Sequence, residues 1–96
     1  MDIVVGIVQE ELAWEDSSAN LKNLGRVIRA SKDNTDLFVL PEMFATGFSM
    51  NVETCAQSMD GEAVAWMKVI SKEKNAAIAG TLIIKEEDKY FNRFVF

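Results

Sequence analysis

The feature that most constrains this chain is a short apolar run that stops at its only proline. Residues 37–40, Leu-Phe-Val-Leu, lead directly into Pro41, and the carboxylate of Glu42 follows. A run of this length and composition predicts a buried strand. Proline lacks the N–H that a strand ladder needs, so the strand should end there and present Glu42 at its tip. In α/β proteins, active sites collect at this edge of the sheet.

Apolar residues and a flexible point follow Glu42 in the sequence. Phe44, Gly47 and Phe48 come soon after it, so we expect apolar surroundings for the carboxylate. A carboxyl group in such surroundings holds a proton more readily, which suits a general base. The alternative is a solvated residue at a strand end, or one that caps the next helix. The pattern alone leaves both interpretations open.

The remaining pattern predicts an α/β fold. The expected elements are, in chain order, a strand at 3–8, a helix at about 19–31, a strand at 36–40, a helix at 62–74, and strands at 76–84 and 90–96. The first strand is almost continuously apolar, which is typical of a strand covered on both faces. The order β-α-β-α-β-β places helices beside a largely parallel sheet that ends in one hairpin.

Capping and turn residues set the expected boundaries. Asp16 and the serines after it should cap the first helix, and Asp60 should cap the second. Asn75 can end the second helix in the left-handed conformation. The Asp-Asn pair at 33–34 predicts the turn into the second strand. Residues 45–59 have the mixed composition of an irregular loop beside a site.

Each predicted helix carries one apolar stripe that should face the core. The inward positions are Leu21, Leu24, Val27 and Ile28 in the first helix and Ala63, Trp66, Met67 and Ile70 in the second. Gly25 lies within the first helix, where it should cost about 1 kcal/mol relative to alanine unless close packing requires it.

Three blocks of the sequence resemble the nitrilase superfamily, the carbon–nitrogen hydrolases. Residues 40–48, L-P-E-M-F-A-T-G-F, resemble the glutamate motif of that family, and especially its ω-amidase-like branch, which acts on small carboxyamides. Residues 3–9 resemble the first strand of the family, which ends in glutamine, and residues 80–84 with 90–93 resemble the next strand pair. The resemblance implies the N-terminal part of an α-β-β-α sandwich.

The resemblance also implies a reaction. In the family the glutamate of this motif is the general base, and this role carries over to Glu42, with a small amide as substrate and without a cofactor. The family's lysine and nucleophilic cysteine lie in later motifs that do not occur here. We therefore expect residues 1–96 to be a truncated N-terminal segment of one hydrolase domain, inactive alone. The resemblance further implies a homo-oligomer and a structural role for Asn92.

Composition excludes several other classes of function. A net charge of −5 with scattered basic residues argues against nucleic-acid binding, which needs clustered lysine and arginine. The chain has no histidine and one cysteine, Cys55, so a zinc site is not expected. A lone cysteine cannot form an intrachain disulfide, and no signal peptide or membrane-spanning stretch is evident. We therefore expect a cytoplasmic protein that does not associate with membranes.

Four further side chains could contact a ligand or take part in chemistry. Phe48 is a candidate substrate-binding residue, with core packing as an equal alternative, whereas core packing is favoured for Phe44. Cys55 has acidic rather than basic neighbours, which argues against a nucleophilic role. The two tryptophans, at 14 and 66, are interpreted as packing residues.

Two alternatives to a carbon–nitrogen hydrolase remain at this stage. One is a small non-enzymatic α/β interaction module whose exposed sheet edge pairs with a partner. The other is a different α/β hydrolase or transferase that uses Glu42 with other residues. A lysine motif and a cysteine motif in the coding sequence after Phe96 would favour the carbon–nitrogen hydrolase over both alternatives.

Overall fold

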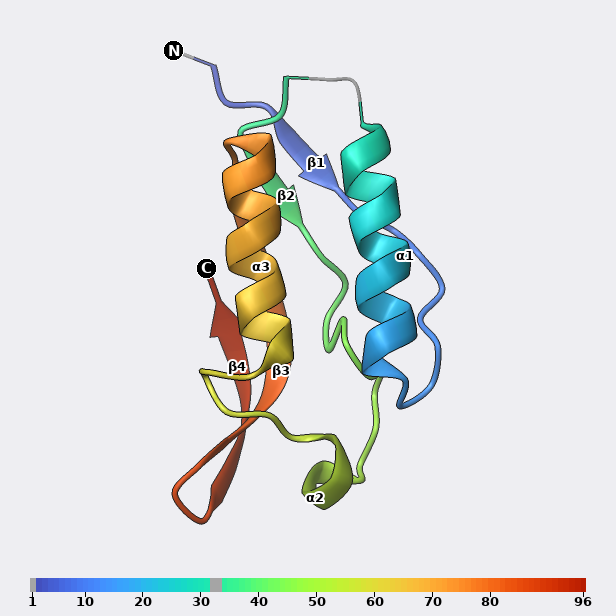
Figure 1. The fold of residues 1–96 in the computed structure, drawn as a ribbon, viewed down its shortest axis with the longest axis vertical. Coiled ribbons are helices and arrows are strands. Elements are labelled where there is room, and N and C mark those ends of the chain that lie inside the picture. Colours follow the sequence, from blue (N-terminus) through green and yellow to red (C-terminus); the bar gives the residue numbers. More distant parts are fainter. Residues whose placement is uncertain (1, 32–33) are drawn as a thin grey trace.

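The computed structural model describes residues 2–31 and 34–96, and it consists of a four-stranded sheet with two long helices along one of its faces (Figure 1). The elements are β1 (Val5–Ile7), α1 (Ser17–Ala30), β2 (Leu37–Val39), α2 (Val52–Cys55), α3 (Glu62–Lys74), β3 (Ala77–Glu86) and β4 (Lys89–Val95). The predicted α/β class and element order are confirmed. The one addition is α2, a single turn within the segment expected to be irregular.

The sheet has the strand order β1-β2-β3-β4. β1 pairs with β2 and β2 with β3 in parallel, with Phe38 opposite both Gly6 and Ile78. β3 and β4 form the antiparallel hairpin, which closes with Glu86 opposite Lys89. The predicted parallel sheet with one hairpin is therefore confirmed, and the carboxyl ends of β1 and β2 lie at the same edge.

The expectation that the first strand is buried on both faces is wrong within the described residues. β1 is only three residues long, and Ile3 and Ile7 are 70% and 71% exposed. Both long helices lie on the same face of the sheet, as Figure 1 shows, and they leave the other face of β1 uncovered. An apolar sequence indicates that a strand can be buried. Which of its faces is buried depends on where the helices lie.

α1 has the predicted cap at Asp16 but starts two residues earlier than predicted, so the two serines lie inside the helix rather than capping it. It begins at Ser17 because Asp16 Oδ1 accepts a hydrogen bond of 3.1 Å from the backbone N–H of Ala19. The inward stripe is confirmed, with Leu21, Leu24 and Ile28 buried and Val27 partly buried. The turn expected at 33–34 falls partly on a residue outside the described ranges.

α3 has the predicted bounds, Glu62–Lys74, but a different cap. The predicted capping by Asp60 is wrong, because Gln57 Oε1 accepts the hydrogen bond of the Ala63 N–H at 2.8 Å instead. The backbone of Gln57 bridges to β3 next to Ile84, so this side chain ties the helix start to the sheet. Asn75 ends the helix at φ 50°, in the left-handed conformation that was predicted.

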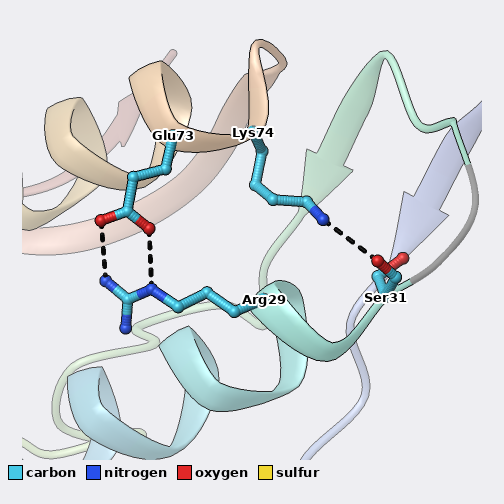
Figure 2. Close-up of polar contacts among 4 residues, drawn as sticks. All are labelled: Arg29, Ser31, Glu73 and Lys74. Carbon is cyan, nitrogen blue, oxygen red and sulfur yellow. Dashed lines mark hydrogen bonds and ion pairs between the residues drawn. The ribbon is translucent and has the colours of Figure 1, made fainter.

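Gly25 allows α1 and α3 to approach closely. A Cβ at this position would lie 3.3 Å from Nε1 of Trp66. The close packing that was expected to explain a glycine inside the helix is therefore present. Figure 2 shows the polar contacts at one end of this interface, where the Arg29 guanidinium donates to both carboxylate oxygens of Glu73, at 2.8 and 3.3 Å. In the same view the Lys74 ammonium donates to the carbonyl of Ser31 at 3.1 Å.

The hydrogen bond between Arg29 and Glu73 raises the pKa of the guanidinium and lowers the pKa of the carboxyl group. A lowered carboxyl pKa adds stability above the unfolded-state value, and this stability is lost as pH falls through the folded-state value. Because the pair is exposed and screened by salt, its main role is to orient the two helix ends.

Phe44 anchors the core beneath the end of β2. Its side chain is fully buried, and its ring centroid lies 5.8 Å from that of Trp66. A Cβ added to Gly80 of β3 would lie 2.8 Å from Cδ2 of Phe44, so the ring occupies the space that a side chain at position 80 would need. The favoured interpretation of Phe44 as a core residue, and that of Trp66 as a packing residue, are confirmed.

Replacing Gly80 with alanine should therefore destabilise the protein. We expect Gly80→Ala to lower the free energy of unfolding by about 1–3 kcal/mol, the usual cost of overpacking a core. Urea unfolding followed by circular dichroism measures the change. The same substitution in a Phe44→Leu background should cost clearly less, because leucine leaves room for the new methyl group. An equal cost in both backgrounds would contradict the packing argument.

Candidate functional site

The candidate site is the turn that follows β2 at the carboxyl edge of the parallel strands. β2 ends at Val39, and the Leu40 N–H still reaches the Ala79 carbonyl of β3 at 2.8 Å. Pro41 then stops the ladder, as predicted, because it has no N–H to donate. The backbone leaves the sheet at this point, and Glu42 is the first residue of the turn.

The turn is fixed to β3 by three contacts. The Met43 N–H donates to Oγ1 of Thr81 at 2.7 Å, and the Phe44 N–H donates to the Thr81 carbonyl at 3.3 Å. The Phe44 ring fills the space beside Gly80. Met43 has φ 47°, a left-handed conformation that is costly for a side chain of this kind, and these contacts maintain it. Glu42 is therefore attached to rigid backbone on both sides.

Glu42 itself is exposed, so the expected apolar surroundings are not formed by the described residues. Phe44 points into the core, and Phe48 is 68% exposed rather than packed over the carboxylate. Within the described residues, Phe48 is therefore not part of the core. The general-base role of Glu42 and the substrate-binding role of Phe48 remain predictions, now with a defined place in the fold.

The side chain of Asn20 joins the loop after β1 to the turn after β2. Its Nδ2 donates to the carbonyls of Ala13, at 2.8 Å, and Ala45, at 2.7 Å. Its Oδ1 accepts from the Ala13 N–H at 2.7 Å. Asn20 is buried, and a buried amide is stable only when its groups are paired. This residue therefore holds both loops at a fixed distance from α1.

The sequence pattern did not predict a role for Asn20. The available signal was its position next to Leu21 and one turn before Leu24, where a polar side chain faces the core side of the helix. The backbone adds a second link between the same loops, because the Glu15 N–H donates to the Thr46 carbonyl at 2.9 Å.

The other singled-out side chains lie at varying distances from this turn. Cys55 is partly buried in α2, with its Sγ 3.7 Å from Oγ of Ser49. Trp14 is 64% exposed, so it is not a core residue. Its ring lies near Gly47, where an added Cβ would be 3.5 Å from Cε3 of the indole. Asn92 is exposed on β4, opposite Ile83.

Two hollows of the surface lie away from Glu42. One, of about 510 Å³, is an apolar groove between α3 and the β3–β4 hairpin, and the other, of about 360 Å³, lies between β1, β2 and α1. No group of three or more possible metal ligands occurs in residues 2–31 and 34–96. Over the same ranges, no helix is long and apolar enough to span a membrane. The candidate site in the described residues therefore consists of the Glu42 carboxylate on the turn after β2.

Comparison with known proteins agrees with the sequence blocks. The family model described as carbon-nitrogen hydrolase matches residues 4–96. The chain is 34% identical over 91 residues to the omega-amidase YafV of Escherichia coli strain K12. This match covers 95% of this chain and 35% of that protein. The chain is 24% identical over 94 residues to the 2-oxoglutaramate amidase of Bacillus subtilis, covering 96% of this chain and 36% of that one.

The fold agrees with a solved structure as well. A crystal structure of a CN-hydrolase superfamily protein from Xanthomonas campestris, with an arsenic adduct in its active site, matches with a TM-score of 0.92 and 33% identity. The match covers 98% of this chain and 36% of that one. The chain thus spans about a third of the length of the proteins it matches. The predicted nitrilase-like α/β architecture is confirmed.

Removal of the Asn20 amide should loosen both loops. We expect Asn20→Ala to lower the free energy of unfolding by about 2–4 kcal/mol, because it leaves three backbone groups without their partner. Asn23→Ala, on the same helix, is the matched control. Its Nδ2 donates to Oε1 of Glu10 at 3.2 Å and its Oδ1 accepts from Arg26 at 2.7 Å, and water can replace both of these side-chain partners, so the loss should stay within about 0.5 kcal/mol. Urea unfolding of both variants tests this, and equal losses would contradict the role of Asn20.

Proposed function

The chain belongs to the carbon–nitrogen hydrolase family, and we propose that it is the N-terminal part of an enzyme that hydrolyses small ω-amides with Glu42 as general base. The observation that supports this most is the turn after β2, which holds Glu42 at the carboxyl edge of the parallel strands. The names of two relatives, an omega-amidase and a 2-oxoglutaramate amidase, support an amide as the substrate.

The proposed reaction begins with proton transfer to Glu42. An amide carbonyl is a poor electrophile and a neutral thiol a weak nucleophile, so the thiol must lose its proton as sulfur attacks. Glu42 takes that proton, and a lysine ammonium stabilises the oxyanion of the tetrahedral intermediate. The protonated Glu42 then gives its proton to the departing amide nitrogen, which leaves as ammonia, and a thioester remains. The Glu42 carboxylate next takes a proton from water, whose oxygen attacks the thioester, and returns that proton to the departing sulfur, so that the product acid and the free thiol are released.

In this proposal the lysine and the nucleophilic cysteine come from outside residues 1–96. Cys55 is an unsuitable nucleophile, because its Sγ is directed to the hydroxyl of Ser49 rather than to Glu42 or a cation. The exposure of Glu42 fits a site whose residues come partly from 1–96 and partly from outside this segment. Further parts of the enzyme would cover the carboxylate and exclude water, whereas the turn supplies its fixed position.

We assign Phe48 to the wall of the substrate pocket. It belongs to the same turn region as Glu42, and its ring is exposed although its neighbour Ser49 is buried. An aromatic ring at that position can pack against the carbon chain of a small amide while Glu42 acts at its carbonyl end. No cofactor enters this reaction, and self-association of the complete enzyme remains a prediction.

Replacing Glu42 with glutamine should abolish turnover in the complete enzyme. Glutamine keeps the shape of the side chain but cannot accept the thiol proton, so kcat should fall by about 10²-fold or more. Steady-state hydrolysis of an ω-amide measures the effect, with a melting curve to verify folding. Glu11→Gln is the matched control, since Glu11 is an exposed carboxylate on the loop after β1. A Glu42→Gln variant that keeps more than about a tenth of kcat would refute the role, because that loss is only ~1.4 kcal/mol.

Changing Cys55 to serine should leave turnover nearly unchanged in the complete enzyme. Serine preserves a donor toward Ser49, so kcat should remain within about threefold of wild type, a difference of less than 1 kcal/mol. Residues 1–96 expressed alone should release no ammonia from ω-amides above the rate in buffer. Turnover by this segment that disappears in its Cys55→Ser variant would show that Cys55 is the nucleophile and that our division of the site is wrong.

A further inference from the structure

We propose that the hydrogen bond between Ser49 and Glu15 positions Phe48 and thereby sets how tightly the complete enzyme binds its amide substrate. This inference rests on the proposed function, because it takes Phe48 as part of the substrate pocket. It goes further by assigning a task to two residues that lie outside the turn with Glu42. They act through Phe48 and are therefore positioning residues rather than catalytic ones.

The hydroxyl of Ser49 has all of its bonding capacity in use. Its Oγ donates to Oε2 of Glu15 at 2.5 Å and accepts from the Asn51 N–H at 3.0 Å. Its second acceptor position faces Sγ of Cys55 at 3.7 Å. A hydroxyl offers one donor and two acceptor positions, so none is left for another partner. Ser49 is also only 2% exposed, which makes any change in these partners costly.

The other side of Phe48 is fixed at Gly47. This residue has φ 77°, and a Cβ added to it would lie 3.5 Å from Cε3 of Trp14. The indole ring therefore lies on the side of Gly47 where a side chain would project. The Ser49 N–H donates to the Gly47 carbonyl at 2.8 Å, which makes a tight bend centred on Phe48. Phe48 is thus held at both neighbours while its own ring points outward.

The loop after β1 is shaped to make these contacts. Glu15 has φ 52°, a left-handed conformation that is uncommon for this residue type and needs support from its surroundings. In this conformation the Glu15 N–H reaches the Thr46 carbonyl at 2.9 Å and the carboxylate reaches Ser49. One strained residue therefore connects the two loops through both its backbone and its side chain.

These contacts predict an effect on binding and not on proton transfer. The Glu15–Ser49 hydrogen bond fixes the backbone on which the Phe48 ring stands, whereas the backbone next to Glu42 is held to β3 by the Thr81 contacts and the Phe44 ring. Loss of the bond should let the ring move away from the carbon chain of the amide. KM should then rise while kcat stays close to its original value.

The test uses Ser49→Ala in the complete enzyme. We expect KM for an ω-amide to rise about tenfold, in the range produced by losing a hydrogen bond to a charged group, and kcat to change by less than about threefold. Ser49→Thr, which keeps the hydroxyl, should restore KM. Ser58→Ala is the matched control, because that exposed hydroxyl also accepts a backbone N–H, from Asp60 at 3.2 Å, in a different loop.

A double-mutant cycle with Phe48→Ala separates positioning from general stability. If Ser49 acts through Phe48, then Ser49→Ala should raise KM little in the Phe48→Ala background. Additive effects on KM, or an unchanged KM in Ser49→Ala, would overturn the proposal. Should Ser49→Ala not fold, Glu15→Asn breaks the same bond, because asparagine tolerates positive φ but is one methylene shorter.

Hydrogen exchange provides a readout that does not depend on activity. Backbone amides at 47–51 should exchange faster in Ser49→Ala and Glu15→Asn than in wild type, and unchanged exchange there would overturn the positioning role. Failure of the proposed function looks different, because it appears as kcat retained in Glu42→Gln. The two hypotheses can therefore fail separately.

Discussion

The insertion of the Phe44 ring beside Gly80 is the contact on which the candidate site depends. The ring enters the core only because β3 has no side chain at that position. Its entry requires the backbone to bend sharply, and the left-handed conformation of Met43 with the hydrogen bonds to Thr81 is the result. Glu42, one residue earlier, is thereby directed outward from rigid backbone. A packing contact in the core thus determines where a carboxylate stands at the surface.

Much of the fold could be predicted from the sequence because its signals are local. The end of α3 at Asn75, the cap of α1 by Asp16 and the end of β2 before Pro41 each follow from residues adjacent to the feature. The features that could not be predicted depend on segments far apart in the chain. Gln57 displaces Asp60 as the cap of α3 only because Gln57 bridges to β3.

The candidate site was predictable to the same extent. The position of Glu42 at a strand end follows from Pro41, but its exposure does not, because Phe44 and Phe48 could have faced it. The role of Asn20 is visible only once the loop after β1 lies beside the turn after β2. Sequence patterns identify which residues can do chemistry, whereas the contacts between loops decide how firmly those residues are held.

These contacts divide the requirements for a general base between two parts of the enzyme that we propose. A base must have a fixed position, and it must be shielded from water so that the proton it receives is held near the reacting atoms. The described residues meet the first requirement through Thr81, Gly80 and the amide of Asn20. They leave Glu42 exposed, so the second requirement must be met by groups that close over the turn. Because the backbone that carries Glu42 is already held, only the rotamers of its side chain remain to be fixed when those groups close.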